Sequence, residues 1–290
     1  MNFSPESKGF STNYTLNIHG RLLDLSKPVV MGILNVTPDS FFDGNLYRNE
    51  SGILKRAGAM LNDGAMIVDI GGYSTRPGAP HVSEEEEIDR ILSAIRPIKK
   101  HFPDSVISID TFRSSVARVA VSEGAGMIND VSGGNLDEQM FQTVRDLRVP
   151  YVLMHMRGDP QTMRDLNEYD HLLTDVITDL QKKLDRLTQL GVPDVIVDPG
   201  FGFAKNIDQN FEMLSALRLL RILERPLLIG LSRKSMIWKT LRVSAAEALG
   251  GTIALNTIAL LEGANILRVH DVKEAVQTIE LVGRVQQKTA

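Results

Sequence analysis

Carboxylate and amide side chains stand at the ends of several apolar runs in this sequence. Asp110, Asn129 and Asp198 each follow a short apolar stretch. If the fold brings these acceptors to one place, they will repel one another unless a ligand supplies hydrogen-bond donors. A flat heterocycle with several N–H groups would do so, and each charge-assisted hydrogen bond would contribute about 1.5 to 3 kcal/mol. The three residues therefore predict a site for a donor-rich ring, with metal binding as the rival interpretation.

A second set of side chains carries positive charge. Arg76, Lys234, Arg268 and His270 suit phosphate groups, although the whole chain is acidic, with a formal net charge of -4. Together the two sets favour a ligand that is both a donor-rich ring and an anion. A metal hydrolase is disfavoured, because the first apolar run has no His-x-His pair and the six histidines are dispersed.

Eight apolar runs must bring these groups together. They cover residues 28–36, 65–72, 105–111, 126–133, 150–156, 194–200, 226–232 and 266–272. Their nearly continuous apolar character predicts parallel strands that are covered on both faces. Helical spacing occupies seven further segments, at 52–62, 83–101, 137–147, 166–190, 209–220, 244–262 and 271–287. This alternation predicts a (β/α)8 barrel, whose ligand site lies at the C-terminal ends of the strands.

The order of the segments also bears on topology and domain count. A doubly wound sheet would carry a glycine-rich phosphate loop after its first strand, and "LNVTPDSFFDG" is no such loop. Residues from about 14 to 26 form two strand-like runs joined at His19 and Gly20, which predicts a β-hairpin capping the N-terminal end of the barrel. No linker, repeat or low-complexity tract divides the chain, so we expect one domain over residues 1–290.

Composition narrows the class of protein. With 43% hydrophobic and 23% charged residues over 290 positions, the chain is typical of a globular protein. The acidic pI near 5.9 argues against nucleic acid as a partner, and the absence of Cys excludes disulfides and thiol chemistry. There is no signal-peptide pattern and no run of about 18 apolar residues. We therefore expect a cytoplasmic protein that binds small molecules and no membrane.

Three loop segments have a composition suited to ligand binding. "TPDSFFDG" and "YSTRPGAP" follow the first and second apolar runs, and both combine Pro and Gly with polar side chains, as loops that close over a ligand do. "DPGFGFAKN" alternates glycine with Phe201 and Phe203, whose rings would either stack on a flat ligand or belong to the core.

These motifs occur together in one known family. "MGILNVTPDSFFDG", "GGYSTRPGA", "SIDT", "INDV", "DPGFGFAKN", "GLSRKS" and "LRVHDV" follow the order seen in dihydropteroate synthases, and the resemblance covers about residues 13 to 288. It implies a TIM barrel that joins 6-hydroxymethyl-7,8-dihydropterin diphosphate to 4-aminobenzoate, releasing diphosphate and 7,8-dihydropteroate. It also implies a step of folate biosynthesis, a target of sulfonamides, Mg2+ as cofactor and a homodimer.

The resemblance assigns site residues by motif. For the pterin it implies Asp110, Asn129, Met154, Asp198, Phe203 and Lys234. For the diphosphate it implies Asn35, Thr75, Arg268 and His270, with Asn35 as a ligand of Mg2+. For 4-aminobenzoate it implies Thr75, Arg76, Phe203, Ser232 and Lys234. The residues expected to be catalytic are Asp39, Asp110, Lys234 and Arg268.

The family's reaction implies a dissociative mechanism. Diphosphate leaves first, and the methylene cation that remains is stabilised by delocalisation into the pterin and by negative groups, with Asp39 as a candidate. The aromatic amine then attacks. Because an aniline-type amine is neutral at pH 7, no strong general base is needed, which agrees with the lack of an obvious nucleophile–base pair.

One position departs from the family pattern. The family usually has Glu in its "GGESTRPG" segment, and this chain has Tyr73. We expect altered anchoring of the loop more than lost activity. Two alternatives stay open: a non-catalytic pterin-binding paralogue, and a pterin-dependent methyltransferase barrel, which would not need Asn35, Arg268 and His270 for a diphosphate.

The segment "GGTIALNTIALLEGA", residues 250–264, is apolar almost all round. Such a helix is either wholly buried or part of a subunit interface. Trp238 lies near it in the sequence, and a dimer would place both at the same surface.

Overall fold

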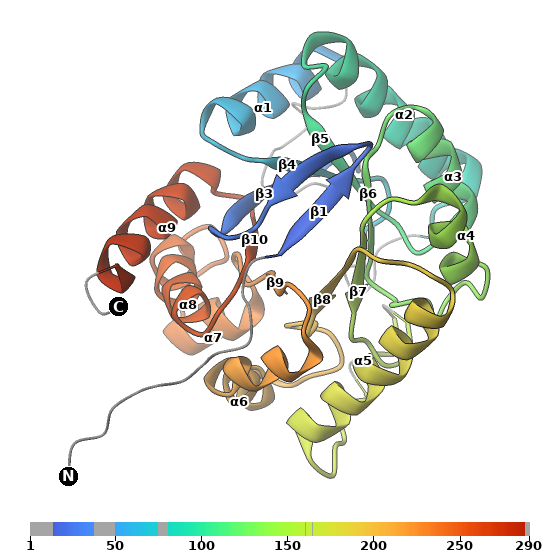
Figure 1. Cartoon of the computed structure of the whole chain (residues 1–290). Helices are drawn as coiled ribbons and strands as arrows, with labels where there is room; N and C mark the ends of the chain where they lie inside the picture. Colours follow the sequence, from blue (N-terminus) through green and yellow to red (C-terminus); the bar gives the residue numbers. More distant parts are fainter. Residues whose placement is uncertain (1–13, 38–49, 75–80, 160, 164, 288–290) are drawn as a thin grey trace, which may run out of the picture.

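A computed structural model of the chain describes residues 14–37, 50–74, 81–159, 161–163 and 165–287. Eight parallel strands form a barrel inside a ring of helices (Figure 1). The strands are β3 (Val29–Asn35), β4 (Ile67–Gly71), β5 (Val106–Asp110), β6 (Met127–Asp130), β7 (Tyr151–Met154), β8 (Val195–Asp198), β9 (Leu228–Ile229) and β10 (Ile266–Val269). Each lies within one of the eight apolar runs, so the strand prediction is confirmed.

The order of the strands around the sheet is β8-β7-β6-β5-β4-β3-β10-β9, with every neighbouring pair parallel. A single parallel bridge between Val197 and Leu227 joins the two edges. The Val197 amide also donates to the carbonyl of Pro226 at 2.9 Å. The sheet therefore closes on itself, which is the predicted (β/α)8 topology.

Helices alternate with the strands and cover the outside of the barrel. They are α1 (Glu50–Asn62), α2 (Glu84–His101), α3 (Ser114–Ser122), α4 (Met140–Leu147), α5 (Leu172–Gln189), α6 (Ile207–Ser215), the 3-10 helix η2 (Leu217–Leu223), α7 (Ser235–Leu241), α8 (Leu249–Leu261) and α9 (Val272–Gln286). Ser83 caps α2, because its hydroxyl oxygen accepts from the amide of Glu86 at 3.2 Å.

Two helices, α3 and α7, were not predicted. Both are short, and both contain β-branched or aromatic residues with modest helix propensity, such as Val116, Ile237 and Trp238. Val116 and Ile237 are buried within the main apolar core. Packing against the barrel stabilises these helices, and local sequence preference contributes little.

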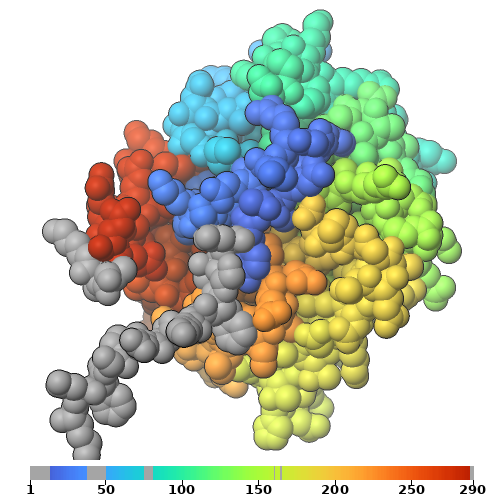
Figure 2. Space-filling view, in the orientation of Figure 1, coloured from blue at the N-terminus to red at the C-terminus, as the bar shows by residue number. Residues whose placement is uncertain are grey.

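The N-terminal hairpin closes the barrel at the ends where the strands begin. β1 (Thr15–Ile18) pairs antiparallel with β2 (Arg21–Asp24) through a turn in which His19 and Gly20 have φ of 50° and 85°. Four hairpin leucine and isoleucine side chains form one buried cluster with residues of seven barrel strands: Leu16, Ile18, Leu23 and Leu25 with Met31, Ile67, Met127, Val152, Ile196, Leu228 and Ile266. Figure 2 shows the hairpin, in dark blue, over the middle of this end. Ligands must therefore enter from the opposite end.

The described helices include none that combines the length and apolar character needed to cross a membrane.

Candidate active site

A cavity of about 1480 Å³ lies at the end of the barrel where the strands finish. Its lining includes seven residues that the sequence assigned to a site: Asn35, Asp110, Phe203, Ser232, Lys234, Arg268 and His270. Asn129, Met154 and Asp198 are buried and are not among the described residues that line it. Asp39, Thr75 and Arg76 lie outside the described residues.

Strand register explains why distant residues meet here. Asn35 pairs with Gly71, Gly71 with Asp110, and Asp110 with Asn129 across four neighbouring strands. In a parallel sheet such paired residues form one row, so the last residues of β3, β4 and β5 share one level with Asn129 of β6. A Cβ at Gly71 would stand only 3.3 Å from the Oδ1 of Asn35. Glycine at this position therefore lets the polar side chains on either side approach.

Arg268 links the acidic side chains of this region. From β10 its Nε donates to Oδ2 of Asp69 at 2.7 Å, and its Nη2 donates to Oδ2 of Asp110 at 2.6 Å. The same Asp69 oxygen accepts from Nδ2 of Asn129 at 3.0 Å. Burial raises the pKa of Asp110 to about 7, against the lowering effect of the Arg268 charge. The two carboxylates raise the pKa of Arg268, which keeps its charge at any physiological pH.

The sequence places Asp69 among the polar residues near the strand ends, but gives it no specific role in the site. Asp69 is fully buried on β4 and binds both Arg268 and Asn129. A carboxylate inside the apolar run "AMIVDIGG" was the available signal, since buried charges are usually paired.

Asp198 and Lys234 form the other side of the acidic region. Oδ1 of Asp198 accepts from the amide of Gly200 at 2.7 Å. Nζ of Lys234 donates to the carbonyl of Phe201 and lies 4.9 Å from the centre of the Phe203 ring. Burial lowers the pKa of Lys234 to about 8 and raises that of Asp198, while each charge favours the charged form of the other. Both groups interact electrostatically with Arg268, so the acidic and basic sets share one end of the barrel.

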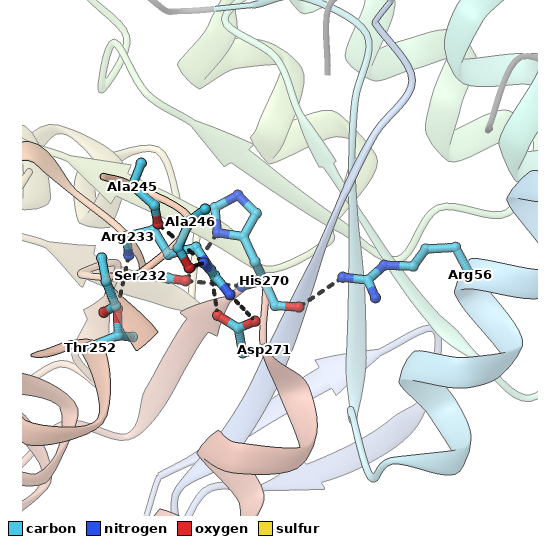
Figure 3. Close-up of polar contacts among 9 residues, drawn as sticks. Arg56, Ser232, Arg233, Ala245, Ala246, Thr252, His270 and Asp271 are labelled. Atoms are coloured by element: carbon cyan, nitrogen blue, oxygen red, sulfur yellow. Dashed lines mark hydrogen bonds and ion pairs between the residues drawn. The ribbon is translucent and has the colours of Figure 1, made fainter. Parts of the chain in front are cut away.

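The segments that follow β9 and β10 are joined by hydrogen bonds at the cavity wall (Figure 3). Oγ of Ser232 lies 3.0 Å from Nδ1 of His270 and accepts from the His270 amide at 3.2 Å. Next to this pair, Arg233 and Asp271 form two parallel hydrogen bonds of 2.8 Å. The carbonyl of His270 accepts from Nη2 of Arg56 on α1 at 2.8 Å. These contacts fix the backbone that carries both Ser232 and His270.

The sequence predicts a positive charge on His270, but in the structure its ring is neutral. Burial and the nearby Arg268 lower its pKa to about 3, so the imidazole is neutral at pH 7. In the tautomer whose Nδ1 accepts from the Ser232 hydroxyl, the neutral ring carries its proton on Nε2. His270 is then a hydrogen-bond donor without a charge.

Tyr73 packs into an aromatic and cationic cluster at the cavity wall. Its ring lies edge-on to Phe112, with 5.1 Å between ring centres, and the Arg113 guanidinium is 5.3 Å from the Tyr73 ring. Arg113 is fixed by the buried Glu87, whose Oε2 accepts from Nη1 at 2.6 Å. Ring contacts with a fixed arginine therefore hold the segment at this position, where the family usually has a carboxylate. Altered anchoring of the loop stays a prediction, because residues 75–80 lie outside the described residues.

Comparison with known proteins agrees with this geometry. The family model described as pterin binding enzyme matches residues 31–270. The chain is 42% identical over 266 residues to the dihydropteroate synthase of Escherichia coli strain K12, covering 91% of this chain and 93% of that protein. The structure of Yersinia pestis dihydropteroate synthase with a sulfonamide drug complex matches with a TM-score of 0.89 and 41% identity, over 94% of this chain and 100% of that one. The Xanthomonas albilineans dihydropteroate synthase with 4-aminobenzoic acid gives 0.86 and 38%, over 94% and 98%.

Proposed function

The chain belongs to the dihydropteroate synthase family of pterin-binding enzymes, and from this premise we propose how its described residues divide the work of the reaction. The enzyme is a transferase of folate synthesis. It joins 6-hydroxymethyl-7,8-dihydropterin diphosphate to 4-aminobenzoate and releases 7,8-dihydropteroate and diphosphate. The observation that carries the assignment of residues is the pairing of Arg268 with Asp69 and Asp110 in the cavity that also contains Lys234 and His270.

The buried acceptors are assigned to the pterin ring. Asp110, Asn129 and Asp198 offer carboxylate and amide oxygens to the N–H and amino groups of the ring, and Lys234 offers a donor to its oxygen. Met154 is buried in a small apolar cluster against which Phe203 packs. The apolar cluster supports a flat ring, and the polar groups orient it.

The basic rim is assigned to the diphosphate. Arg268 supplies a fixed charge, and His270 supplies an N–H donor through Nε2. These groups are worth most in the transition state, because negative charge accumulates on the departing diphosphate as its bond to the methylene carbon breaks. The dissociative path and the role of Asp39 remain predictions.

The residues present fit a magnesium ion shared with the substrate. Within the described ranges, no group of three or more His, Asp or Glu side chains could hold a metal by itself. Mg2+ often binds through one or two protein oxygens together with phosphate oxygens and water, and Oδ1 of Asn35 at the end of β3 can be such a ligand. When bound there, the ion would neutralise charge on the leaving group.

The aminobenzoate end of the cavity is assigned to Phe203, Ser232 and Lys234, with Thr75 and Arg76 expected from the adjoining loop. Ser232 is held by His270, and the Phe203 ring lies over Lys234. The ring can stack on the benzoate, and the positive charge nearby favours its carboxylate. The amine needs no general base before it attacks, because the aniline nitrogen is already neutral.

A homodimer through α7, α8 and α9 is the proposed assembly. Among the described residues, seven of the eleven exposed large apolar side chains lie on η2 and these three helices: Leu219, Ile222, Leu241, Ile258, Leu261, Leu281 and Val285. The other side of α8 is buried against the core, through Ala259 and Leu260. Helices α7, α8 and α9 lie side by side on the outside of the barrel (Figure 1), and exposed apolar side chains on neighbouring helices are typical of a subunit interface.

One assay tests the function. Purified protein is mixed with the pterin diphosphate, 4-aminobenzoate and Mg2+, and dihydropteroate is measured by chromatography. We expect product that depends on both substrates and disappears when EDTA is added. Tight binding of the pterin without any product would instead favour a non-catalytic pterin-binding protein.

A further inference from the structure

Lys205 is a buried cation in the cavity wall that the reaction described above does not use. It lies in the loop between β8 and α6 and is 9% exposed. Its Nζ is 3.0 Å from Nδ1 of His155, and it donates to the carbonyls of Gly200 and Phe203, both at 3.2 Å. An ammonium group has three N–H donors, and these three acceptors use all of them. Lys205 therefore cannot donate to a substrate without giving up one of these bonds.

The chemistry of His155 matches this arrangement. Burial and the charges of Lys205, Lys183 and Arg157 lower the pKa of His155 to about 2, so its ring is neutral. Its Nδ1 can then accept from the ammonium, which places the ring proton on Nε2. Burial lowers the pKa of Lys205 to about 7, even though the Asp198 charge raises it. The three acceptors around Nζ are best satisfied by the charged amine.

The segment that Lys205 holds has an unusual backbone. Gly200 has a φ of +72°, and a Cβ there would overlap the carbonyl oxygen of His155. Ala204 also lies in the left-handed region, with a φ of +48°, which is uncommon for a residue with a side chain. The amide of Gly202 donates to Oδ1 of Asn210 at 2.6 Å. A conformation of this kind persists only when surrounding contacts fix it.

The same short segment presents three groups to the pterin region. The segment covers residues 198–203, and its first residue is Asp198. The carbonyl of Phe201 accepts from Lys234, and the Phe203 ring lies 4.9 Å from the Lys234 ammonium. We infer that Lys205 is a positioning residue for the pterin: its three hydrogen bonds hold residues 198–203 so that these groups face Lys234. The inference rests on the proposed function, because it takes this region as the pterin site.

The charge of Lys205 has a second effect, on Asp198. That carboxylate is surrounded by the cations Lys234, Arg268 and Lys205, which come from three different segments of the barrel. Each of them opposes the rise in the pKa of Asp198 that burial causes. Lys205 itself is faced by Asp198, Lys234, Arg157 and Asp179. Removing the Lys205 charge therefore makes Asp198 harder to ionise, and an ionised Asp198 is the form that accepts hydrogen bonds from the ring.

Lys205→Met tests both effects, since Met is a flexible side chain of similar length without charge or donors. The dissociation constant of 6-hydroxymethyl-7,8-dihydropterin diphosphate is measured by calorimetry from pH 5 to pH 9. We expect affinity at pH 7.5 to fall about tenfold or more. The acidic limb of the binding profile should move to higher pH. Lys205→Arg keeps the charge, so it should restore the acidic limb and recover only part of the affinity, because a planar guanidinium cannot match three converging acceptors.

The matched control is Lys182→Met, the same substitution at an exposed position of α5, which should bind like the wild type. A purely structural role would lower thermal stability without a charge-dependent shift of the acidic limb. Wild-type affinity and an unmoved acidic limb in Lys205→Met would overturn the inference.

A measurement on the unmodified protein covers the case in which Lys205→Met does not fold. Long-range 1H–15N NMR of His155 should show a neutral ring with its proton on Nε2 from pH 5 to pH 8. Titration of His155 near its ordinary value of about 6.5 would contradict the proposed hydrogen bond. Absence of dihydropteroate formation by the wild type would instead count against the proposed function and leave these two tests valid.

Discussion

Arg268 on β10 and Asp110 on β5 form an ion pair of 2.6 Å across the mouth of the barrel, although 158 positions separate them in the chain. β4 and β3 lie between their two strands in the sheet. The guanidinium therefore joins the carboxylates assigned to the pterin ring to the region assigned to the diphosphate. Arg268 can therefore interact with the diphosphate and, through the carboxylates that it binds, influence the pterin ring of the same substrate.

Arg268→Ala should weaken binding of the pterin diphosphate far more than binding of the free hydroxymethyl pterin. The reason is that the fixed charge acts on the diphosphate, and each charge-assisted bond is worth about 1.5 to 3 kcal/mol. We expect at least a tenfold difference between the two losses, measured by calorimetry, together with a fall in kcat/KM. Arg268→Lys keeps a charge but cannot bond Asp69 and Asp110 through two separate nitrogens, so it should be intermediate. Equal losses for both ligands would contradict the assigned role.

The activity should fall as the pH drops through about 7. Burial raises the pKa of Asp110 to about 7, and only its ionised form balances the Arg268 charge and leaves both oxygens free of a proton. Protonation thus increases as the pH decreases below that value, and kcat/KM for the pterin diphosphate decreases with it. A pH–rate profile checks this. In Asp110→Asn the profile should be lower throughout, and its acidic limb should change because only the contribution of Asp198 remains. An unchanged limb would assign it to Asp198 or another group.

Tyr73→Ala should destabilise the fold by about 1 to 2 kcal/mol and raise the KM for 4-aminobenzoate. The substitution removes the ring contacts with Phe112 and Arg113, which anchor the wall of the cavity. Urea unfolding and steady-state kinetics measure the two effects. Tyr73→Phe keeps the ring and should behave like the wild type. If the Phe variant lost as much as the Ala variant, the hydroxyl group and not the ring would be the anchor.

Leu281→Glu should convert the proposed dimer into a monomer. Leu281 is 70% exposed on α9, within the apolar surface shared with α7 and α8, and a buried charge at an interface is strongly unfavourable. Light scattering after size-exclusion chromatography measures the mass. The control is Leu22→Glu on β2 of the hairpin, where the leucine is 72% exposed and lies outside the helices of the proposed interface. A wild-type protein that is already monomeric would rule out the proposed assembly.

Much of the fold could be predicted from the sequence. The eight strands could be predicted because parallel strands that are covered on both faces have continuous apolar sequences. The polar residues of the site could be predicted because they stand at the ends of these apolar runs. The hairpin followed from its two strand-like runs at His19 and Gly20. The short helices α3 and α7 were missed, because their stability comes from packing on the barrel and not from their own residues.

The sequence by itself therefore determined the barrel, the end at which ligands bind and the family. The barrel, its ligand-binding end and the family can be predicted from the periodicity of apolar residues and from the order of motifs, and both are properties of the linear sequence. Only the tertiary structure decided that Arg268 forms hydrogen bonds with Asp69 and Asp110 and that His270 is neutral. It also decided that the ammonium of Lys205 forms its hydrogen bonds with groups of the protein and that Tyr73 packs on Arg113. Hydrogen-bond partners and pKa values depend on distance and desolvation, and both arise only when segments remote in the sequence are packed together.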